Sequence, residues 1–258
     1  MVMGILAVAF ALITPVLYAL IIGDMPQDPS MEALLGGSFT AKAQFFESFS
    51  PGNNLGLIVP VLLAIVLCKD FSFGTVRNKI ISGKSRSAIF VSMYTVCATA
   101  LWTVMLIHAL ITLGFSLLFF EFQTDPFTMA DVGYLLLSLL FELLIYLFIA
   151  AFLCWLCVLM RNVGLAIVLY VAAIMGLSMI AALLQVLGMA LQMDGGNETA
   201  VKILEFFNRI NVCNSYMVIG KGETYSLSDV LYLVLPPLVG AVGFFGAGLL
   251  KFKRKDIK

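Results

Sequence analysis

Long apolar stretches recur along this chain and leave few folds open to it. They cover about residues 1–22, 52–68, 88–120, 133–160, 163–191 and 230–250. A transmembrane helix needs about 20 predominantly apolar residues, and in lipid only helices and closed barrels satisfy every backbone hydrogen bond. The stretches lack the alternation of a β-barrel strand. We therefore predict an all-α polytopic membrane protein with six transmembrane helices in a single transmembrane domain, residues 1–258.

Composition supports lipid as the solvent for this surface. The 258 residues are 62% hydrophobic and 12% charged, whereas soluble domains average about 45–50% apolar and about 25% charged residues. A soluble fold of this length could not bury so much apolar surface. The stretch 1–22 lacks the basic start and the small-residue cleavage site of a signal peptide, so we expect it to be a retained span.

The distribution of basic residues predicts the orientation. Loops 69–87 and 161–162 and the tail 251–258 hold 11 of the 15 basic residues: Lys69, Arg77, Lys79, Lys84, Arg86, Arg161, Lys251, Lys253, Arg254, Lys255 and Lys258. Loops that are rich in Lys and Arg stay in the cytoplasm. We therefore expect both termini on the cytoplasmic side of the membrane. The membrane that we expect is the inner (cytoplasmic) membrane of a bacterium. The basic tail is expected to contact anionic lipid and no nucleic acid.

The loop 69–87 contains Gly83-Lys84-Ser85, which resembles the end of a phosphate-binding loop. That motif needs a glycine five residues before Gly83, and position 78 is Asn78, so nucleotide binding by this chain is excluded. Instead, the spacing of Phe73, Val76 and Ile80 predicts a short amphipathic helix that stops at Gly83. Its apolar face could enter a groove of a soluble partner or only touch lipid headgroups, and periodicity leaves both open.

The stretch CKDFSFGTVRNKIISGKSRSAIFVSMY, residues 68–94, resembles the signature of type-2 ABC exporter permeases. Their pattern has an acidic residue after the second span, then Gly-Thr, a basic and apolar helix, and an arginine before the third span. This chain has Asp70 where the family usually has Glu. Many members also carry a basic stretch before the first span, whereas this sequence starts almost at its first apolar stretch. We therefore expect either that the protein is a short variant of the family or that its true N-terminus lies upstream.

The resemblance implies that 69–87 is a coupling helix docking on a separate ABC ATPase. Its expected coupling residues are Asp70, Phe71, Phe73, Gly74, Thr75, Val76, Arg77, Ile80 and Arg86. That partner would bind ATP and Mg, while this chain would hold no cofactor, metal or catalytic residue of its own. Six spans form half of a transport pathway, so a second permease, identical or related, is also implied. The expected function is export of a substrate such as a drug or an antimicrobial peptide. The sequence does not indicate which substrate is transported.

Two other classes of function are weighed against export. An immunity or sensor protein could keep the permease fold and sequester a peptide without pumping it. An intramembrane enzyme is disfavoured, because the chain has a single histidine and its spans hold one carboxylate where a protease needs two.

Two ionisable residues lie inside predicted spans. Glu142 and His108 sit at comparable depth, about ten and about twelve residues from the predicted outer ends of their spans. Ionisable residues at that depth are costly and often functional. They could form a substrate or proton site, or only a satisfied hydrogen bond between helices, and the sequence leaves both open.

Smaller patterns predict packing. Span 230–250 carries Gly240, Gly243, Gly246 and Gly248, which would allow close helix packing, and Pro236-Pro237 would mark a break at its outer start. The outer loop 192–229 is expected to be helical, with Val201, Leu204 and Phe207 on one face.

Overall fold

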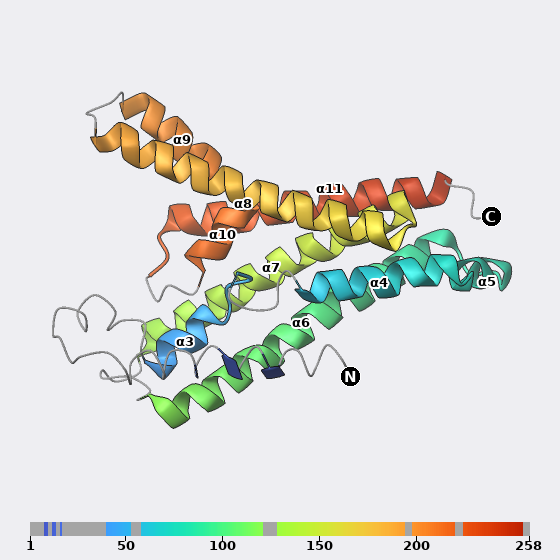
Figure 1. Ribbon diagram of the computed structural model, residues 1–258, viewed down its shortest axis with the longest axis horizontal. Helices are drawn as coiled ribbons and strands as arrows, with labels where there is room; N and C mark the ends of the chain where they lie inside the picture. Colours follow the sequence, from blue (N-terminus) through green and yellow to red (C-terminus); the bar gives the residue numbers. More distant parts are fainter. Residues whose placement is uncertain are drawn as a thin grey trace. The chain divides into compact units, whose positions relative to one another are not determined.

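The structure is a computed structural model, and it describes residues 8–9, 12–13, 16, 40–52, 58–120, 128–193, 198–219 and 224–254 (Figure 1). These residues form helices, turns and short loops, and no strand occurs among them. The prediction of an all-α fold is therefore confirmed. The predicted span 1–22 lies almost wholly outside the described residues.

Four of the described helices are long and apolar enough to cross a bilayer. They are α6 (Arg86–Phe119), α7 (Met129–Met160), α8 (Val163–Met193) and α11 (Leu227–Arg254). A fifth candidate consists of α4 (Ile58–Ser72) and α5 (Thr75–Ile81), which pass the same test only as a pair bent by 52°. By length and composition these helices identify a multi-pass membrane protein. The predicted spans in this region agree with the helices to within a few residues at most ends.

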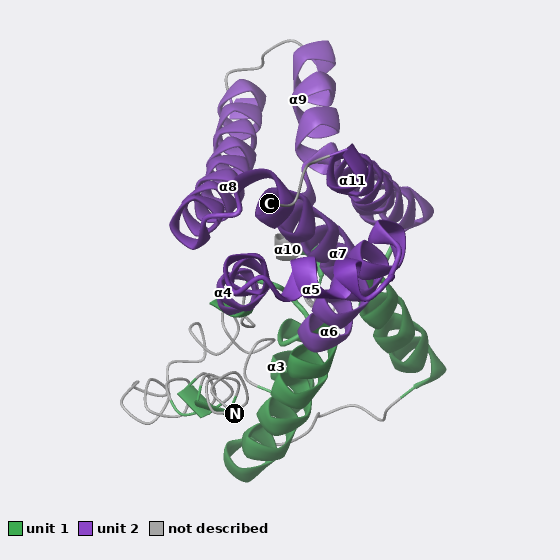
Figure 2. Ribbon diagram, turned by 90° about the vertical axis from the view of Figure 1, so that its right-hand side faces the viewer, with its two compact units in different colours: residues 1–59, 102–143, 217–225 green, residues 60–101, 144–216, 226–258 purple. Residues whose placement is uncertain are grey.

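The chain divides into two compact units, coloured separately in Figure 2. Unit 1 comprises residues 1–59, 102–143 and 217–225, and unit 2 comprises residues 60–101, 144–216 and 226–258. The boundary falls inside α6 and inside α7, so each of these long helices contributes one part to each unit. Each unit is described separately below.

Polar residues at the helix ends explain where the helices begin. The Thr128 amide and hydroxyl donate to the Asp131 carboxylate at 2.7 and 2.9 Å, which caps α7. The Ser226 amide and hydroxyl donate to Asp229 at 3.1 and 2.6 Å, and the Asp229 amide donates back to the Ser226 hydroxyl, which caps α11. Such reciprocal caps satisfy amides that have no partner within the helix. The acidic side chains also interact favourably with the positive end of the helix dipole.

Unit 2 is held together by aromatic rings from α6, α7 and α11. Phe244 of α11 meets Phe152 and Trp155 of α7 at ring-centroid distances of 4.9 and 5.2 Å. Phe90 of α6 lies 5.4 Å from Phe245 and is fully buried. Aromatic pairs at these separations stabilise a fold beyond the area they bury, so these contacts fix the three helices together.

Glycines let α11 approach its neighbours at two specific places in unit 2. A Cβ atom on Gly240 would lie 2.6 Å from the Phe148 ring, and one on Gly248 would lie 2.7 Å from the Phe90 ring. Gly243 and Gly246 have no such neighbour within 4 Å. The predicted close packing is therefore confirmed for two of the four glycines. Pro236 and Pro237 lie inside α11, which begins at Leu227, and not at its start.

The segment after α8 is helical, as predicted. It contains α9 (Glu198–Ile210) and α10 (Val212–Val218), and α9 runs back beside α8 (Figure 1). The Asn211 side chain donates to the Leu177 carbonyl of α8 at 2.7 Å. Cys213 donates its thiol to the Ile174 carbonyl at 3.7 Å, and burial raises the pKa of this thiol, so it stays protonated as a donor.

The three apolar residues predicted to share one face of α9 differ in their burial. Val201 is buried and Leu204 half-buried, but Phe207 is exposed. At about 100° per residue, Phe207 lies roughly 120° around the helix from Val201, whereas Asn208 lies about 20° from it. The face of α9 that turns inward therefore carries Asn208 in place of Phe207.

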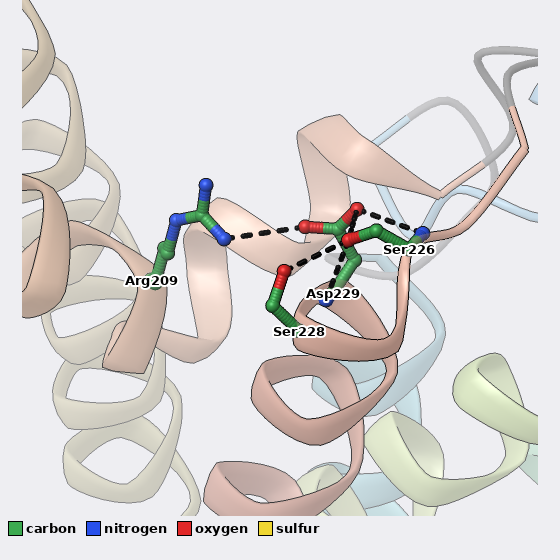
Figure 3. A network of polar contacts seen from close by, with 4 residues as sticks. All are labelled: Arg209, Ser226, Ser228 and Asp229. Carbon is green, nitrogen blue, oxygen red and sulfur yellow. Dashed lines mark hydrogen bonds and ion pairs between the residues drawn. The ribbon is translucent and has the colours of Figure 1, made fainter.

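A polar network joins α9 to the start of α11 (Figure 3). Arg209 pairs with the Asp229 carboxylate at 3.3 Å, and its guanidinium lies 5.6 Å from the centre of the Tyr232 ring. The carboxylate that caps α11 therefore also binds α9, which links two helices that are separated in sequence by α10.

Unit 1 is organised by the short helix α3 (Ala41–Glu47). Its residue Lys42 pairs with Asp131 of α7, and its Phe46 ring meets Tyr134 of α7 edge-on at 4.9 Å. On its other side, Gln44 accepts a hydrogen bond from Ser116 of α6 at 2.7 Å. Helix α3 thus contacts both long helices within this unit.

Candidate functional site

The predicted coupling segment, residues 69–87, forms a sharp elbow within unit 2. Helix α4 ends at Ser72, and Gly74 then adopts a left-handed conformation with φ of 71° before α5 begins at Thr75. Glycine is favoured at such a position because a Cβ atom would strain the backbone. The result is the 52° bend between α4 and α5. We call residues 69–87 the elbow.

A complete Schellman motif ends α5. The Gly83 amide donates to the Ile80 carbonyl at 3.0 Å, and the Lys84 amide donates to the Lys79 carbonyl at 3.2 Å. Gly83 has a left-handed φ of 86°, as this motif requires at the first residue beyond the helix cap. The predicted helix stop at Gly83 is therefore confirmed. Ser85 then caps α6 through the Ala88 amide at 3.2 Å.

Contacts with α6 and with the end of α11 anchor the elbow. Phe71 meets Phe252 edge-on at a centroid distance of 6.1 Å, and Phe90 of α6 lies 5.9 Å from the same ring. Arg86 donates to the Lys253 carbonyl at 2.9 Å, which satisfies one of the terminal carbonyls of α11. The elbow is therefore a fixed feature of unit 2.

Two large apolar side chains project from the elbow into the surroundings. Phe73 is 75% exposed and Ile81 is 73% exposed. Exposed aromatic and aliphatic side chains grouped on one short segment are typical of an interaction site. The elbow and the end of α11 also carry a series of basic residues: Lys69, Arg77, Lys79, Lys84, Arg86, Lys251, Lys253 and Arg254.

The structure differs from the prediction about which apolar residues face outward. Val76 was predicted to share an exposed face with Phe73 and Ile80, but it is only 1% exposed, and Ile80 is half-buried. The reason is that Phe73 lies in the turn before α5 and does not follow the helical periodicity of Val76. Ile81, which the sequence analysis did not select, takes the exposed place.

The remaining predicted elbow residues have modest roles in the structure. Asp70 lies 3.9 Å from Lys79, and both side chains are more than a third exposed. Ion pairs of this kind contribute at most about 1 kcal/mol. Thr75 is half-buried at the first position of α5, and Arg77 is exposed.

The intramembrane residues His108 and Glu142 both belong to unit 1 and are buried, with 2% and 0% of their surface exposed. Neither ring nitrogen of His108 has a hydrogen-bond partner among the described residues. Burying an unsatisfied polar group costs about 1–3 kcal/mol. Both residues therefore lie in the interior of unit 1, where burying a polar group without a partner is costly.

A comparison with known protein families gives a match over most of the chain. The sequence profile described as "Protein of unknown function (DUF2705)" matches residues 31–258. The chain belongs to the DUF2705 family. Searches of curated proteins and of solved structures found no significant match to it.

The DUF2705 chain also has a cavity of about 200 Å³ between α8 and α9, within unit 2. Its lining residues are Leu184, Gln185, Gly188, Met189, Gln192, Glu205 and Asn208. The Asn208 side-chain oxygen is buried and has no hydrogen-bond partner among the described residues. Asn208 faces inward for the reason given above for α9.

For metal ions, the described residues of the DUF2705 chain contain no group of three or more His, Cys, Asp or Glu side chains placed to bind one. Its five cysteines are free and buried. Among the described residues, the candidate sites are therefore the elbow, the cavity between α8 and α9, and the buried polar side chains of unit 1.

Proposed function

We propose that this DUF2705 protein is the membrane subunit of an ABC exporter. In this proposal a separate ABC ATPase, which binds ATP and Mg, docks on the elbow, and the chain pairs with a second permease. The observation that carries the proposal is the exposure of Phe73 and Ile81 on a rigid elbow between α4 and α6. The resemblance of residues 68–94 to exporter permeases supports the same reading.

The mechanism follows from how the elbow is attached. Phe73 and Ile81 would insert into an apolar groove of the ATPase, while the basic residues of the elbow and of the end of α11 would attract an acidic rim. Because the elbow is fixed to α6 and α11 through Phe71, Phe252 and Arg86, a movement of the ATPase would be transmitted to those helices. The basic residues around the elbow also favour the cytoplasmic side, where an ATPase has access to ATP.

The test is co-purification of the full chain with its partner ATPase. Phe73→Asp and Ile81→Asp should each weaken the complex at least tenfold, because anchor residues at interfaces contribute about 2 kcal/mol or more. The matched control is Leu227→Asp, since Leu227 is 82% exposed and lies at the opposite end of α11 from Phe252. It should leave the complex intact.

Val76→Asp is a second control with a different expectation. It would place a charge in the interior, so it should destabilise the folded chain itself. Loss of the complex in this variant would therefore not be evidence about docking. A complex that survives both Phe73→Asp and Ile81→Asp would refute the docking proposal. If those variants instead lose binding to anionic vesicles, the elbow is a lipid-contacting helix and the exporter assignment fails.

The test for an immunity or sensor protein uses cells that carry a partner ATPase unable to hydrolyse ATP. Export predicts that resistance or transport is lost in these cells. Resistance that persists would show sequestration without pumping.

A further inference from the structure

The cavity of about 200 Å³ between α8 and α9 brings together side chains of two helices within one compact unit. The two helices run side by side (Figure 1). Asn211, directly after α9, fixes this pair by donating to the Leu177 carbonyl of α8 at 2.7 Å. Pockets for drug-sized ligands commonly measure about 300–1,000 Å³. This cavity therefore suits a small molecule or one functional group of a larger molecule.

The wall that α8 contributes follows one side of the helix. Gln185, Gly188 and Gln192 are spaced by three and four residues, so they lie above one another along the last turns of α8. Between the two glutamines, a Cβ atom added to Gly188 would meet nothing within 4 Å. Part of the space in the cavity therefore exists because residue 188 has no side chain.

The wall that α9 contributes carries a carboxylate and an amide. Glu205 and Asn208 are three residues apart, so they share one side of α9. The Asn208 side-chain oxygen is buried and has no hydrogen-bond partner among the described residues. Leaving a buried acceptor without a donor is costly. The cavity therefore has a place for a ligand that donates hydrogen bonds.

The cavity is negatively charged, because Glu205 is the one ionisable residue in its lining. The neighbouring basic residues of α9 are engaged elsewhere: Lys202 lies 3.4 Å from Glu198, and Arg209 lies 3.3 Å from Asp229. Glu205 itself forms no ion pair with a described residue. A carboxylate whose charge is not balanced nearby favours a positively charged ligand over a neutral or negative one.

The hydrogen-bonding groups of the lining narrow the kind of cation. Four lining side chains carry an amide or carboxylate oxygen that accepts hydrogen bonds: Gln185, Gln192, Glu205 and Asn208. A guanidinium group presents five N–H donors in one plane, whereas an ammonium group presents three. The guanidinium group is also the more weakly hydrated of the two. It therefore loses less hydration on contact with the apolar part of the lining, Leu184 and Met189.

We propose that this cavity binds a guanidinium group carried on an alkyl chain. The Glu205 carboxylate supplies the opposite charge, the Asn208 oxygen accepts one of the N–H groups, and the alkyl chain contacts Leu184 and Met189. The group belongs either to a small solute or to an arginine side chain of a peptide, which share this chemistry. This inference concerns binding by the chain alone and stands independently of the proposed exporter function.

The test is equilibrium binding of radioactive agmatine to the purified full chain in detergent, without any ATPase. Agmatine carries a guanidinium group at one end of an alkyl chain and an ammonium group at the other. We expect saturable binding that propylguanidine displaces, with propylamine a clearly weaker competitor because it has fewer N–H donors. The absence of saturable binding would overturn the proposal, and so would equal displacement by the two competitors.

Glu205→Gln tests the charge of the site. It should weaken agmatine binding about tenfold or more, because it removes a hydrogen bond between charged groups. The matched control is Glu198→Gln, which removes the same charge from the same helix but does not line the cavity, so it should leave binding unchanged. Equal weakening by both variants would indicate a diffuse attraction of cations to α9 and would overturn the proposed site.

Gly188→Leu tests the shape of the site without changing its charge. The leucine side chain would occupy the open space beside residue 188, so saturable binding should be lost. Gly176→Leu is the matched control, because Gly176 also belongs to α8 and also has nothing within 4 Å of an added Cβ atom, but it does not line the cavity. Full retention of binding in Gly188→Leu would overturn the proposal.

Asn208→Ala separates ligand binding from a structural role. The variant removes an oxygen that has no partner in the folded chain, so resistance to unfolding by SDS should not fall, whereas agmatine binding should weaken severalfold. A loss of stability with unchanged binding would show that Asn208 serves the fold, and would overturn its assignment to the site.

A second competitor distinguishes the two sources of the guanidinium group. N-acetylarginine amide presents the group as a peptide does. Displacement of agmatine by this compound more strongly than by propylguanidine supports a peptide side chain as the ligand, and the reverse order supports a small solute. Failure of both compounds to displace agmatine would overturn the proposal. Because no ATPase is present, none of these results bears on whether an ATPase docks at the elbow.

Discussion

The close approach at Gly248 gives a sharp test of the packing of α11. A methyl group added by Gly248→Ala would lie 2.7 Å from Cζ and 3.1 Å from Cε2 of Phe90, and 3.4 Å from the Cα atom of Trp155. Phe90 is fully buried, with Phe245 at 5.4 Å and Phe252 at 5.9 Å. Its ring therefore has little freedom to move away, and the methyl group must overpack the interior.

Gly246→Ala is the matched control, because nothing lies within 4 Å of its added methyl group. Both substitutions raise helix propensity by up to about 1 kcal/mol, and this contribution cancels when the two variants are compared. Overpacking a core costs about 1–3 kcal/mol. We therefore expect Gly248→Ala to have a free energy of unfolding about 1–3 kcal/mol lower than that of Gly246→Ala.

Equilibrium unfolding in mixed micelles with increasing SDS measures this difference. A thiol-reactive dye is a suitable probe, because all five cysteines are free and buried and belong to unit 2, as Gly248 does. Adding Phe90→Leu to Gly248→Ala should recover part of the lost stability by making room. Equal stability of Gly246→Ala and Gly248→Ala would refute the close approach of α11 to Phe90.

Two further predictions concern polar groups. Asp229→Ala removes both the cap shared with Ser226 and the pair with Arg209, so it should lower the free energy of unfolding by about 1–2 kcal/mol. Arg209→Ala removes only the pair and should lower it by less than about 1 kcal/mol. Equal losses for the two variants in an SDS titration would contradict the capping role of Asp229. Burial raises the pKa of Glu47, so folded Glu47 binds its proton more tightly than unfolded Glu47, and its stabilising contribution is present at low pH and lost as pH rises through the folded pKa. Glu47→Gln should remove this fall in thermal stability above the ordinary glutamate pKa of about 4.3, and an unchanged pH profile would show that other groups cause it.

For the elbow, the periodicity of the sequence predicted the helix and its end but not which side chains are exposed. The sequence predicted its helix and the stop at Gly83, because the glycine and the basic and apolar spacing are local signals. It did not predict that Val76 turns inward and Ile81 outward, since the left-handed Gly74 changes the direction of the chain between Phe73 and Val76. That change depends on how the elbow is attached to Phe252 and Arg86.

The polar residues of unit 1 likewise include some that the sequence identified and some that only the structure revealed. Glu142 and His108 were selected from the sequence because ionisable residues in apolar runs are rare. Thr112, Ser116 and Ser138 were missed, although their spacing of four residues from His108 and Glu142 is a signal that could have found them. Gln44 could not have been found this way, because only the contact with Ser116 joins α3 to this group.

The amino-acid sequence by itself determined that the described part of the chain is helical, that several of its helices are long and apolar enough to cross a membrane, and roughly where these helices begin and end. These properties follow from hydropathy and capping signals within a few residues of each helix end. The tertiary structure decided which side of each helix faces inward: which two glycines admit an aromatic ring, which elbow residues are exposed, and which polar groups meet. The physical reason is that a membrane-spanning helix is apolar on nearly all sides. Its rotation about its own axis is therefore set by the side chains of the other helices that pack against it.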